Sequence, residues 1–345
     1  MTPRQKWMLI IAVSVVALGT TAGIGVSSWA QFQAKQNAPS AVQTGAPTAW
    51  AKGDRIVFRN TAIGQGYGLV ASVPLSDPEG PRSLSRTACD RVDARPDQFA
   101  CLRSERGITP TYTATIYADD GAERLQWPLA GVPSRTRFSP DGSLVATTAF
   151  VTGHSYATVG FSTVTAIHQT SDGTSFGSLE EWKLTIDGAE SAPTDRNYWG
   201  VTFVDDNTFY ATAGMTLSGR TYLVKGDIRT KTLTSVIESV ECPSLSPDGT
   251  RIAFKRVTSG SGATVHWTPA VLDLATGKVT VLDVETRNVD DQIAWLDDDT
   301  LLYGMPRPDA AGDTDVWALA ASGSRAPRVL IEHAWSPSVV KADAG

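Results

Sequence analysis

The sequence of 345 residues predicts an all-β protein, a six-bladed β-propeller preceded by one N-terminal transmembrane helix. Three observations lead to this prediction. Residues 7–26 form an uninterrupted apolar stretch near the N-terminus. From residue 54 onward, short runs of alternating apolar and polar residues are separated by turn residues. A turn motif built around Ser-Pro-Asp-Gly recurs among these runs at the spacing of propeller blades.

The composition is that of a folded domain with many turns. Hydrophobic residues make up 41% of the chain and include 10 Trp, which is enough apolar material for a core. The 30 Gly and 19 Pro indicate frequent turns and therefore short strands. The net charge is −6, and no basic cluster is interleaved with aromatic residues. This charge argues against nucleic acid as a partner, because phosphate backbones would repel the domain.

The apolar stretch at residues 7–26 has the length of a transmembrane helix. At a rise of about 1.5 Å per residue it spans roughly the 30 Å of a bilayer core. Arg4 and Lys6 precede it, and the next basic residue is Lys35. The positive-inside rule then predicts that residues 1–6 are cytoplasmic and that the domain is extracytoplasmic, held at the plasma membrane by a single-pass signal anchor.

A cleaved signal peptide is the alternative interpretation of this N-terminus. Ser28-Trp29-Ala30 resembles a weak cleavage site, and cleavage near Ala30 would give a secreted protein. Signal peptides have shorter apolar regions, which favours the uncleaved anchor. Residues 27–53 are rich in Gln, Ala, Pro, Ser and Thr, so we expect a flexible linker there.

The turn motif has two sharp copies, Phe138–Ala146 (FSPDGSLVA) and Leu245–Phe254 (LSPDGTRIAF). Residues 203–210 and 295–303 are degenerate copies, and residues 335–340 are a truncated one. In the motif, Pro fixes φ, Asp bonds nearby backbone groups and Gly accepts the positive φ that closes a turn. Since apolar strands flank it, each copy predicts a β-hairpin.

Successive copies lie about 65, 42, 50 and 40 residues apart, and each period holds about four strands. This spacing predicts a propeller over residues 54–341. Seven or five blades would also fit. Residues 334–341 are too short for a blade, so we expect them to close the ring against the first blade and remove an open sheet edge. The six expected blades are residues 54–87, 88–132, 133–190, 198–240, 241–288 and 290–331.

The two sharp motif copies resemble the repeats of TolB-type, WD40-like propellers, and the likeness extends over residues 54–341 through the repeat. The chain is most similar to the membrane-anchored, uncharacterised members of that group. TolB itself carries an additional α/β domain before its propeller, where this chain has only the apolar segment and the linker. The partnership of TolB with the Tol–Pal envelope system is therefore not carried over to this chain.

Two of the three cysteines are expected to form a disulfide. Cys89 and Cys101 flank a turn-rich stretch centred on residues 94–97, and could face each other across a hairpin. Disulfides persist in the oxidising space outside the cytoplasm. The alternative is a pair of unlinked small core residues. Cys242 begins an apolar run and is expected to be a buried free thiol.

The sequence carries no recognisable catalytic or metal motif, and we expect no catalytic residue, no metal and no cofactor. The four His are dispersed, without the close pairs of zinc sites. Asp-rich turns occur at residues 205–206, 290–291 and 297–299, without the ligand spacing of a calcium-binding EF-hand loop. We interpret these acids as solvated turn residues or hairpin caps.

The third expected blade is about 20 residues longer than the others, with the excess within residues 151–180. Because propellers bind partners through loops, this segment is the candidate partner-binding loop. Its aromatic residues, with two that precede the next blade, could form a binding patch. They could equally fill the seam between blades. The candidate residues are His154, Tyr156, Phe161, Tyr198 and Trp199.

Two functions remain open on the sequence alone. The first is a non-enzymatic, membrane-anchored scaffold that binds an unknown envelope protein or polymer. The second is a carbohydrate-active or hydrolytic propeller that uses a pair of carboxylates in its channel, about 5–9 Å apart. The missing catalytic motif favours the first.

Overall fold

The structure, a computed structural model, describes residues 2–45, 53–151 and 162–342. It contains two compact units. One comprises residues 1–41 and 62–67, and the other comprises the remainder of the chain. Each is described by itself.

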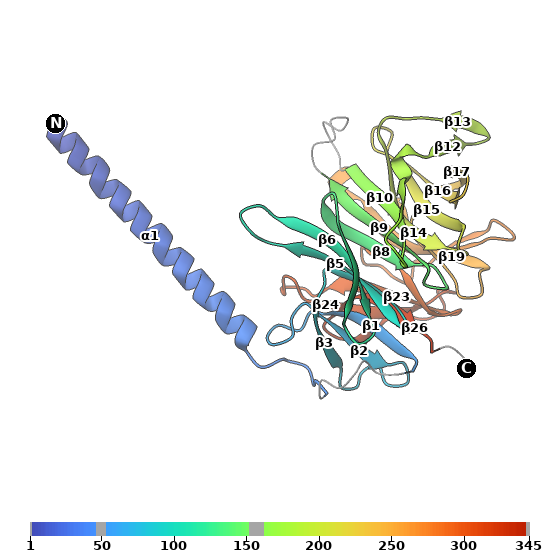
Figure 1. Ribbon diagram of the computed structural model, residues 1–345, viewed down its shortest axis with the longest axis horizontal. Coiled ribbons are helices and arrows are strands. Elements are labelled where there is room, and N and C mark those ends of the chain that lie inside the picture. The colour runs from blue at the N-terminus through green and yellow to red at the C-terminus, as the bar shows by residue number, and fades with distance from the viewer. Residues whose placement is uncertain (1, 46–52, 152–161, 343–345) are drawn as a thin grey trace. The chain divides into compact units, whose positions relative to one another are not determined.

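The first unit is dominated by α1, a single long helix from Pro3 to Asn37 (Figure 1). Thr2 caps its N-terminus by accepting a hydrogen bond from the backbone of Gln5. Within residues 3–34, an 18-residue window has a mean hydropathy of 2.2, and the helix is long and apolar enough to cross a membrane. A signal sequence would meet the same criteria. Beyond the helix, the backbone N–H of Gln65 donates to the carbonyl of Ala38 at 2.9 Å.

The prediction of a flexible linker over residues 27–53 needs correction. Residues 27–37 continue α1, because this stretch contains good helix formers such as Ala and Gln and no Pro or Gly. Further along, Thr44 forms a parallel β-bridge with Arg82, and the backbone of Gly45 donates to the carbonyl of Arg82 at 3.0 Å. The prediction for residues 46–52 lies outside the described residues.

The second unit is a six-bladed propeller, as predicted, with its strands in six sheets (Figure 1). Five sheets have four strands and the fourth blade has six. In blade one the order is β26 (Ala334–Val340), β1 (Arg55–Asn60), β2 (Leu69–Pro74) and β3 (Ser83–Ala88). Blade two contains β4 (Arg91–Arg95), β5 (Gln98–Glu105), β6 (Thr111–Ala118) and β7 (Glu123–Pro128). Blade three contains β8 (Val132–Phe138), β9 (Leu144–Val151), β10 (Ser162–Gln169) and β11 (Ser175–Ser178).

The other three blades follow the same antiparallel order from the inside outward. Blade four contains β14 (Arg196–Phe203), β15 (Thr208–Met215), β16 (Arg220–Asp227) and β17 (Thr232–Glu238). Blade five contains β18 (Glu241–Leu245), β19 (Arg251–Ser259), β20 (His266–Asp273) and β21 (Val279–Val281). Blade six contains β22 (Ala294–Asp297), β23 (Thr300–Pro306), β24 (Thr314–Ala320) and β25 (Arg328–Ile331).

The C-terminal strand closes the ring, which confirms the prediction for residues 334–341. β26 pairs antiparallel with β1, with Arg55 opposite Val340. It supplies the innermost strand of blade one, because β26, β4, β8, β14, β18 and β22 contact one another in this cyclic order. Blade one thus joins the two ends of the propeller sequence and leaves no inner edge unpaired.

Apolar side chains fill every seam between neighbouring blades. Six hydrophobic clusters occur, one for each pair of adjacent blades. Between blades two and three, for example, Ile116 packs with Phe138 and Val145. Both faces of each sheet are therefore buried, and removal of this apolar surface from water is the main force that holds the ring together.

The end of the third expected blade, residues 179–191, leads into and extends blade four. A 3₁₀ turn at Leu179–Glu181 leads into β12 (Lys183–Ile186) and β13 (Ala189–Ser191). β12 pairs in parallel with β17, and β13 pairs with β12, so the hairpin extends the outer edge of that blade (Figure 1). Within the predicted loop of residues 151–180, β10 and β11 are sheet of blade three, and residues 152–161 lie outside the described residues.

Both sharp motif copies form the expected turns. In the first, the backbone N–H of Gly142 donates to the carbonyl of Ser139 at 3.0 Å, and Gly142 has φ +74°. The Ser139 hydroxyl donates to Asp141 at 2.6 Å and accepts from the backbone of Leu144 at 2.9 Å. In the second, Ser246 and Asp248 repeat these contacts.

The disulfide between Cys89 and Cys101 is present, as predicted, with Cα atoms 5.4 Å apart. Cys101 lies on β5, and Cys89 lies in the connection from blade one to blade two, so the bond fixes this connection. Cys242 is a buried free thiol on β18, which also agrees with the prediction.

Candidate functional site

A cavity of about 680 Å³ opens at one end of the propeller channel. Residues from the C-terminal parts of all six inner strands line it. Its rim includes the turns that follow these strands, among them both Ser-Pro-Asp-Gly copies. We call this end the motif face and the opening the channel mouth. The repeat detected in the sequence therefore surrounds this cavity.

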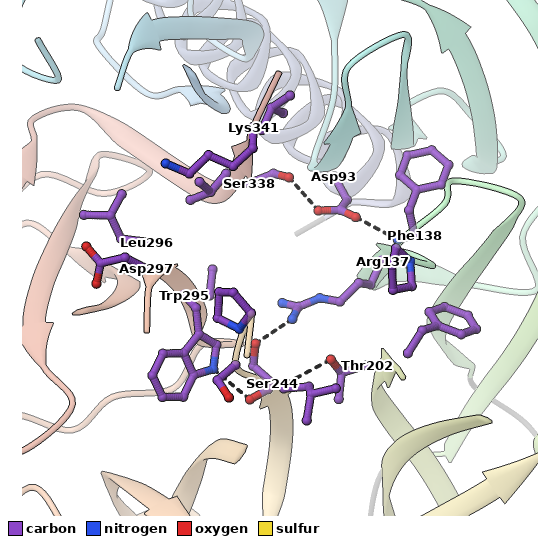
Figure 2. Close-up of a pocket in the computed structure, with 18 of the residues that line it drawn as sticks. Asp93, Arg137, Phe138, Thr202, Ser244, Trp295, Leu296, Asp297, Ser338 and Lys341 are labelled. Atoms are coloured by element: carbon purple, nitrogen blue, oxygen red, sulfur yellow. Dashed lines mark hydrogen bonds between the residues drawn. The ribbon is translucent and has the colours of Figure 1, made fainter. Parts of the chain in front are cut away.

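Hydrogen bonds between inner strands shape the wall of the channel mouth. Asp93 on β4 accepts from the Ser338 hydroxyl at 2.6 Å and from the backbone N–H of Phe138 at 2.7 Å (Figure 2). It thereby joins blades one, two and three. On the other side, Trp295 Nε1 donates to the carbonyl of Ser244 at 2.9 Å, which joins blades five and six.

Arg137 on β8 extends across the channel mouth (Figure 2). Its Nη1 donates to the hydroxyl of Ser244 at 2.6 Å, and its Nη2 donates to the carbonyl of Ile293 at 3.3 Å. These acceptors belong to blade five and to the segment leading into blade six. A side chain from blade three therefore spans the channel and presents a guanidinium group in the cavity.

Deeper in the channel, two cations are paired with carboxylates. Arg91 Nη1 lies 3.3 Å from Asp291 Oδ1, and the Arg91 guanidinium stacks 4.8 Å from the ring of Trp335. Lys255, whose side chain is 4% exposed, lies 2.5 Å from Asp290. Asp291 is 1% exposed and also accepts from the backbone of Gly304 at 2.9 Å.

Arg135 also lies in this deeper part of the channel. Burial works to lower its pKa, but Cys242, Asp291 and Asp290 around it outweigh this effect and raise the pKa above its ordinary value. Burial, followed by the like charge of Arg135, lowers the pKa of Arg91 to about 10. The guanidinium groups of Arg91, from blade two, and Arg135, from blade three, are therefore neighbours in the channel.

The pKa of Arg137 is also lowered, because burial outweighs the attraction of Asp93. On the rim, the hydroxyl of Ser246 and the backbone of Thr250 bond Asp248 and lower its pKa to about 2. Asp248 is thus charged at neutral pH, on the rim of the cavity that Arg137 also lines.

The residues of the predicted binding loop are not brought together at a described surface. His154, Tyr156 and Phe161 lie outside the described residues. Tyr198 is fully buried in the cluster between blades three and four, and Trp199 is 9% exposed, with its ring against Gly214. The Tyr198 ring fills the seam between blades three and four, and the Trp199 ring lies against its own blade, so neither contributes to a surface patch.

The Asp-rich turns divide into two kinds. Asp205 accepts from the backbone of Asn207 at 2.8 Å, and Asp297 accepts from the backbone of Asp299 at 2.9 Å, which agrees with hairpin caps. The interpretation was wrong for Asp291, which is buried in the channel because Arg91 compensates its charge. Among the residues that the structure describes, no group of His, Cys, Asp and Glu could hold a metal ion.

Sequence reasoning did not identify the channel cations. One signal was available, since Arg135 and Arg137 alternate on a strand that leads directly into a sharp motif copy. Residues two apart on a strand point to the same side, and here that side faces the channel. What the sequence could not show is which side of this strand faces inward.

No protein-family profile and no curated protein matches the chain. Among solved structures, TolB from Acinetobacter baumannii superposes with a TM-score of 0.57 at 16% identity, over 84% of this chain and 67% of that protein. A puromycin-hydrolyzing peptidase of Mycobacterium tuberculosis superposes with a TM-score of 0.48 at 14% identity, over 87% of this chain and 48% of that one. An oligogalacturonate lyase in complex with manganese superposes with a TM-score of 0.46 at 12% identity, over 75% of this chain and 72% of that one. With its six blades and its closing C-terminal strand, the chain has a TolB-like β-propeller fold.

Proposed function

We propose that the protein is a non-enzymatic scaffold, anchored in the plasma membrane by α1, whose extracytoplasmic propeller binds an envelope protein or polymer at the channel mouth. One observation carries this proposal. The cavity of about 680 Å³ is lined by all six inner strands and rimmed by the repeated turns, so every blade contributes to one concave surface. Concave sites of this size are where proteins usually bind ligands.

The state of the channel acids favours binding over catalysis. Asp93 is held by Ser338 and Phe138, while Asp290 and Asp291 are paired with Lys255 and Arg91. A catalytic pair of glycosidase type needs one carboxyl group that keeps its proton and one that acts as base or nucleophile. Burial works to raise the pKa of Asp290, but the attraction of Lys255 outweighs this effect and lowers the pKa, so this acid serves poorly as a proton donor.

The orientation in the membrane follows from Arg4 and Lys6, which precede the apolar part of α1. A cysteine in place of Ile108 tests it. Ile108 is fully exposed in the turn between β5 and β6. We expect a membrane-impermeant maleimide to label Ile108→Cys in intact cells. Labelling only after lysis would contradict the orientation.

Blocking the channel mouth tests the binding site. Pro247 is exposed on the rim of the channel mouth. Ile108 lies on the β5–β6 turn, at the end of blade two that is opposite the motif face. Full-length Pro247→Cys and Ile108→Cys would each be labelled with a polyethylene glycol maleimide and used to capture partners from solubilised envelopes. We expect the label at position 247 to prevent a capture that the label at position 108 permits. Equal capture by both would contradict binding at the motif face.

A further inference from the structure

Inside the channel mouth, each blade contributes an apolar side chain that the fold leaves partly or fully exposed. Val204 is 39% exposed, and Leu296 lies next to Asp297 at the opening (Figure 2). The apolar residues that line the cavity without being buried include, in blade order, Val339, Pro96, Pro140, Val204, Leu245 and Leu296. An apolar recess of this kind gains stability when a partner covers it and removes it from water.

The turns on the rim of this recess are acidic. Five turns directly follow the inner strands of blades two to six, at residues 96–97, 139–143, 204–207, 246–250 and 298–299. Together these turns contain seven Asp and no Lys or Arg. Because Asp caps several of these hairpins and the ring brings their ends together, acids far apart in the sequence surround one opening.

Most of these rim carboxylates have no basic side chain beside them. Asp97 is paired with Arg124 at 3.1 Å, and Asp248 is paired with Arg251 at 3.6 Å. Among residues 2–45, 53–151 and 162–342, no nitrogen of a Lys, Arg or His side chain lies within 4.0 Å of the other rim carboxylates. Their negative charge is therefore open to a partner.

The rim acids keep this charge at neutral pH. Burial works to raise the pKa of Asp141, but hydrogen bonds from Ser139 and Ser143 outweigh this effect and lower the pKa. Burial also works to raise the pKa of Asp205, where backbone N–H groups of the same turn outweigh it and lower the pKa. Hydrogen bonds that favour the charged form thus accompany the turn geometry.

The basic side chains that line the cavity do not compensate the rim. Arg137 bonds across the channel, as described above, and Arg95 Nε donates to the carbonyl of Ser139 at 2.9 Å. Lys341 lies 3.3 Å from Asp54, which belongs to none of the five turns. In the described part of the chain, these three cations have no ion pair with a carboxylate of the rim turns.

We propose that the channel mouth binds a protein segment in which an apolar side chain is flanked by Lys or Arg residues. The apolar side chain enters the recess and leaves water, while the basic side chains lie over the rim turns. The acidic rim would repel a polyanionic envelope polymer, which is the other kind of occupant. This inference deepens the proposed function, because it rests on the channel mouth as the binding site and names the chemistry of the partner.

Random dodecapeptides displayed on phage are the probe, selected on the full chain in detergent. We expect the selected sequences to be enriched in Lys and Arg next to Leu, Val or aromatic residues. The most enriched peptide, made with a fluorescein label, should bind about tenfold more weakly at about 500 mM NaCl than at about 50 mM, because salt screens exposed charges. Fluorescence anisotropy measures this affinity.

The double variant Asp206→Asn, Asp299→Asn tests the rim. Both residues are exposed on rim turns, and neither carboxylate accepts a hydrogen bond in the described part of the chain. We expect this variant to bind the peptide about fivefold more weakly than wild type. The matched control is Asp283→Asn, Asp309→Asn. It removes the same charge from exposed positions after β21 and on the β23–β24 turn, at the blade ends opposite the motif face, and should bind as wild type does.

The outcomes separate the chemistry of the partner from the place where it binds. A polyethylene glycol label on Pro247→Cys should block the peptide. Selection of acidic or uncharged peptides that this label blocks would overturn the inference and leave the binding site in place. Basic peptides that still bind the labelled protein would instead contradict the channel mouth as the site.

Three further results would also overturn the inference. They are the selection of no peptide at all, equal affinity of the double variant and its control, and binding of fluorescein-labelled dextran sulfate more tightly than the peptide. The last result would favour a polyanionic polymer as the occupant.

Discussion

Replacing Ser338 by Ala tests whether hydrogen bonds between inner strands hold the ring closed. Ser338 lies on β26, is 4% exposed, and bridges blades one and two. Its hydroxyl donates to Asp93 at 2.6 Å and accepts from the backbone N–H of Ala94 at 3.0 Å. In the Ser338→Ala variant, both groups on β4 lose this partner.

The two losses differ in cost. Asp93 lines the channel mouth and keeps the backbone N–H of Phe138, so water can replace the lost donor. Ala94 is 2% exposed, and its N–H is left without an acceptor. An unsatisfied buried donor costs about 1–3 kcal/mol, so we expect a loss of about 2 kcal/mol in the free energy of unfolding. For a domain of this size, the loss corresponds to a fall in Tm of about 4 °C.

Thermal unfolding of the full chain in detergent, read by tryptophan fluorescence, measures this effect. Ser322→Ala is the control, because Ser322 is exposed and its hydroxyl bonds the hydroxyl and the backbone N–H of Ser324, which is also exposed. We expect the control to change Tm by less than about 1 °C. If Ser338→Ala were as mild as Ser322→Ala, the inner-strand hydrogen bonds would not be what joins the C-terminal strand to blade two.

Three further predictions concern other parts of the fold. Replacing Cys89 and Cys101 together by Ser should lower the free energy of unfolding by about 3 kcal/mol, and an unchanged denaturant midpoint would contradict a stabilising role for the bond. Asp248 has a pKa lowered to about 2 by its bond from Ser246, so its contribution to stability is complete above about pH 4 and is lost as pH falls towards 2. Asp248→Asn should therefore flatten the decline in stability between these pH values, and identical profiles would show that the turn does not depend on the charge. The buried hydroxyl of Tyr198 has no hydrogen-bond partner among the described residues, so Tyr198→Phe should change the free energy of unfolding by less than about 0.5 kcal/mol, whereas Tyr198→Ala should cost about 3–5 kcal/mol. A loss of less than about 1 kcal/mol in Tyr198→Ala would contradict burial of the ring in the seam between the blades.

The parts of the fold that were predictable from sequence depend on local chemistry. The motif turns at residues 139–142 and 246–249 formed as expected, because Ser, Pro, Asp and Gly satisfy one another within a few residues. The closing strand was predictable because residues 334–341 are too few for a blade. Pairing them with the first blade removes the open sheet edge that the ring would otherwise have.

The parts that were missed depend on contacts between distant residues. Asp291 has the sequence context of a solvated turn, and its burial depends on Arg91, which lies 200 positions away. β12 and β13 are short and partly exposed, so their alternation is weak, and their pairing depends on the free edge of β17. The inward side of β8 likewise depends on which of its faces the neighbouring blades cover.

Site-directed photo-crosslinking in intact cells tests the central claim most directly. A photoreactive residue would replace Pro140 on the rim of the channel mouth, Ile108 on the turn between β5 and β6, or Tyr156 in the loop that the sequence favoured. We expect a discrete crosslinked product from position 140 and none from position 108. A product from position 156 or position 108, with none from position 140, would contradict binding at the motif face.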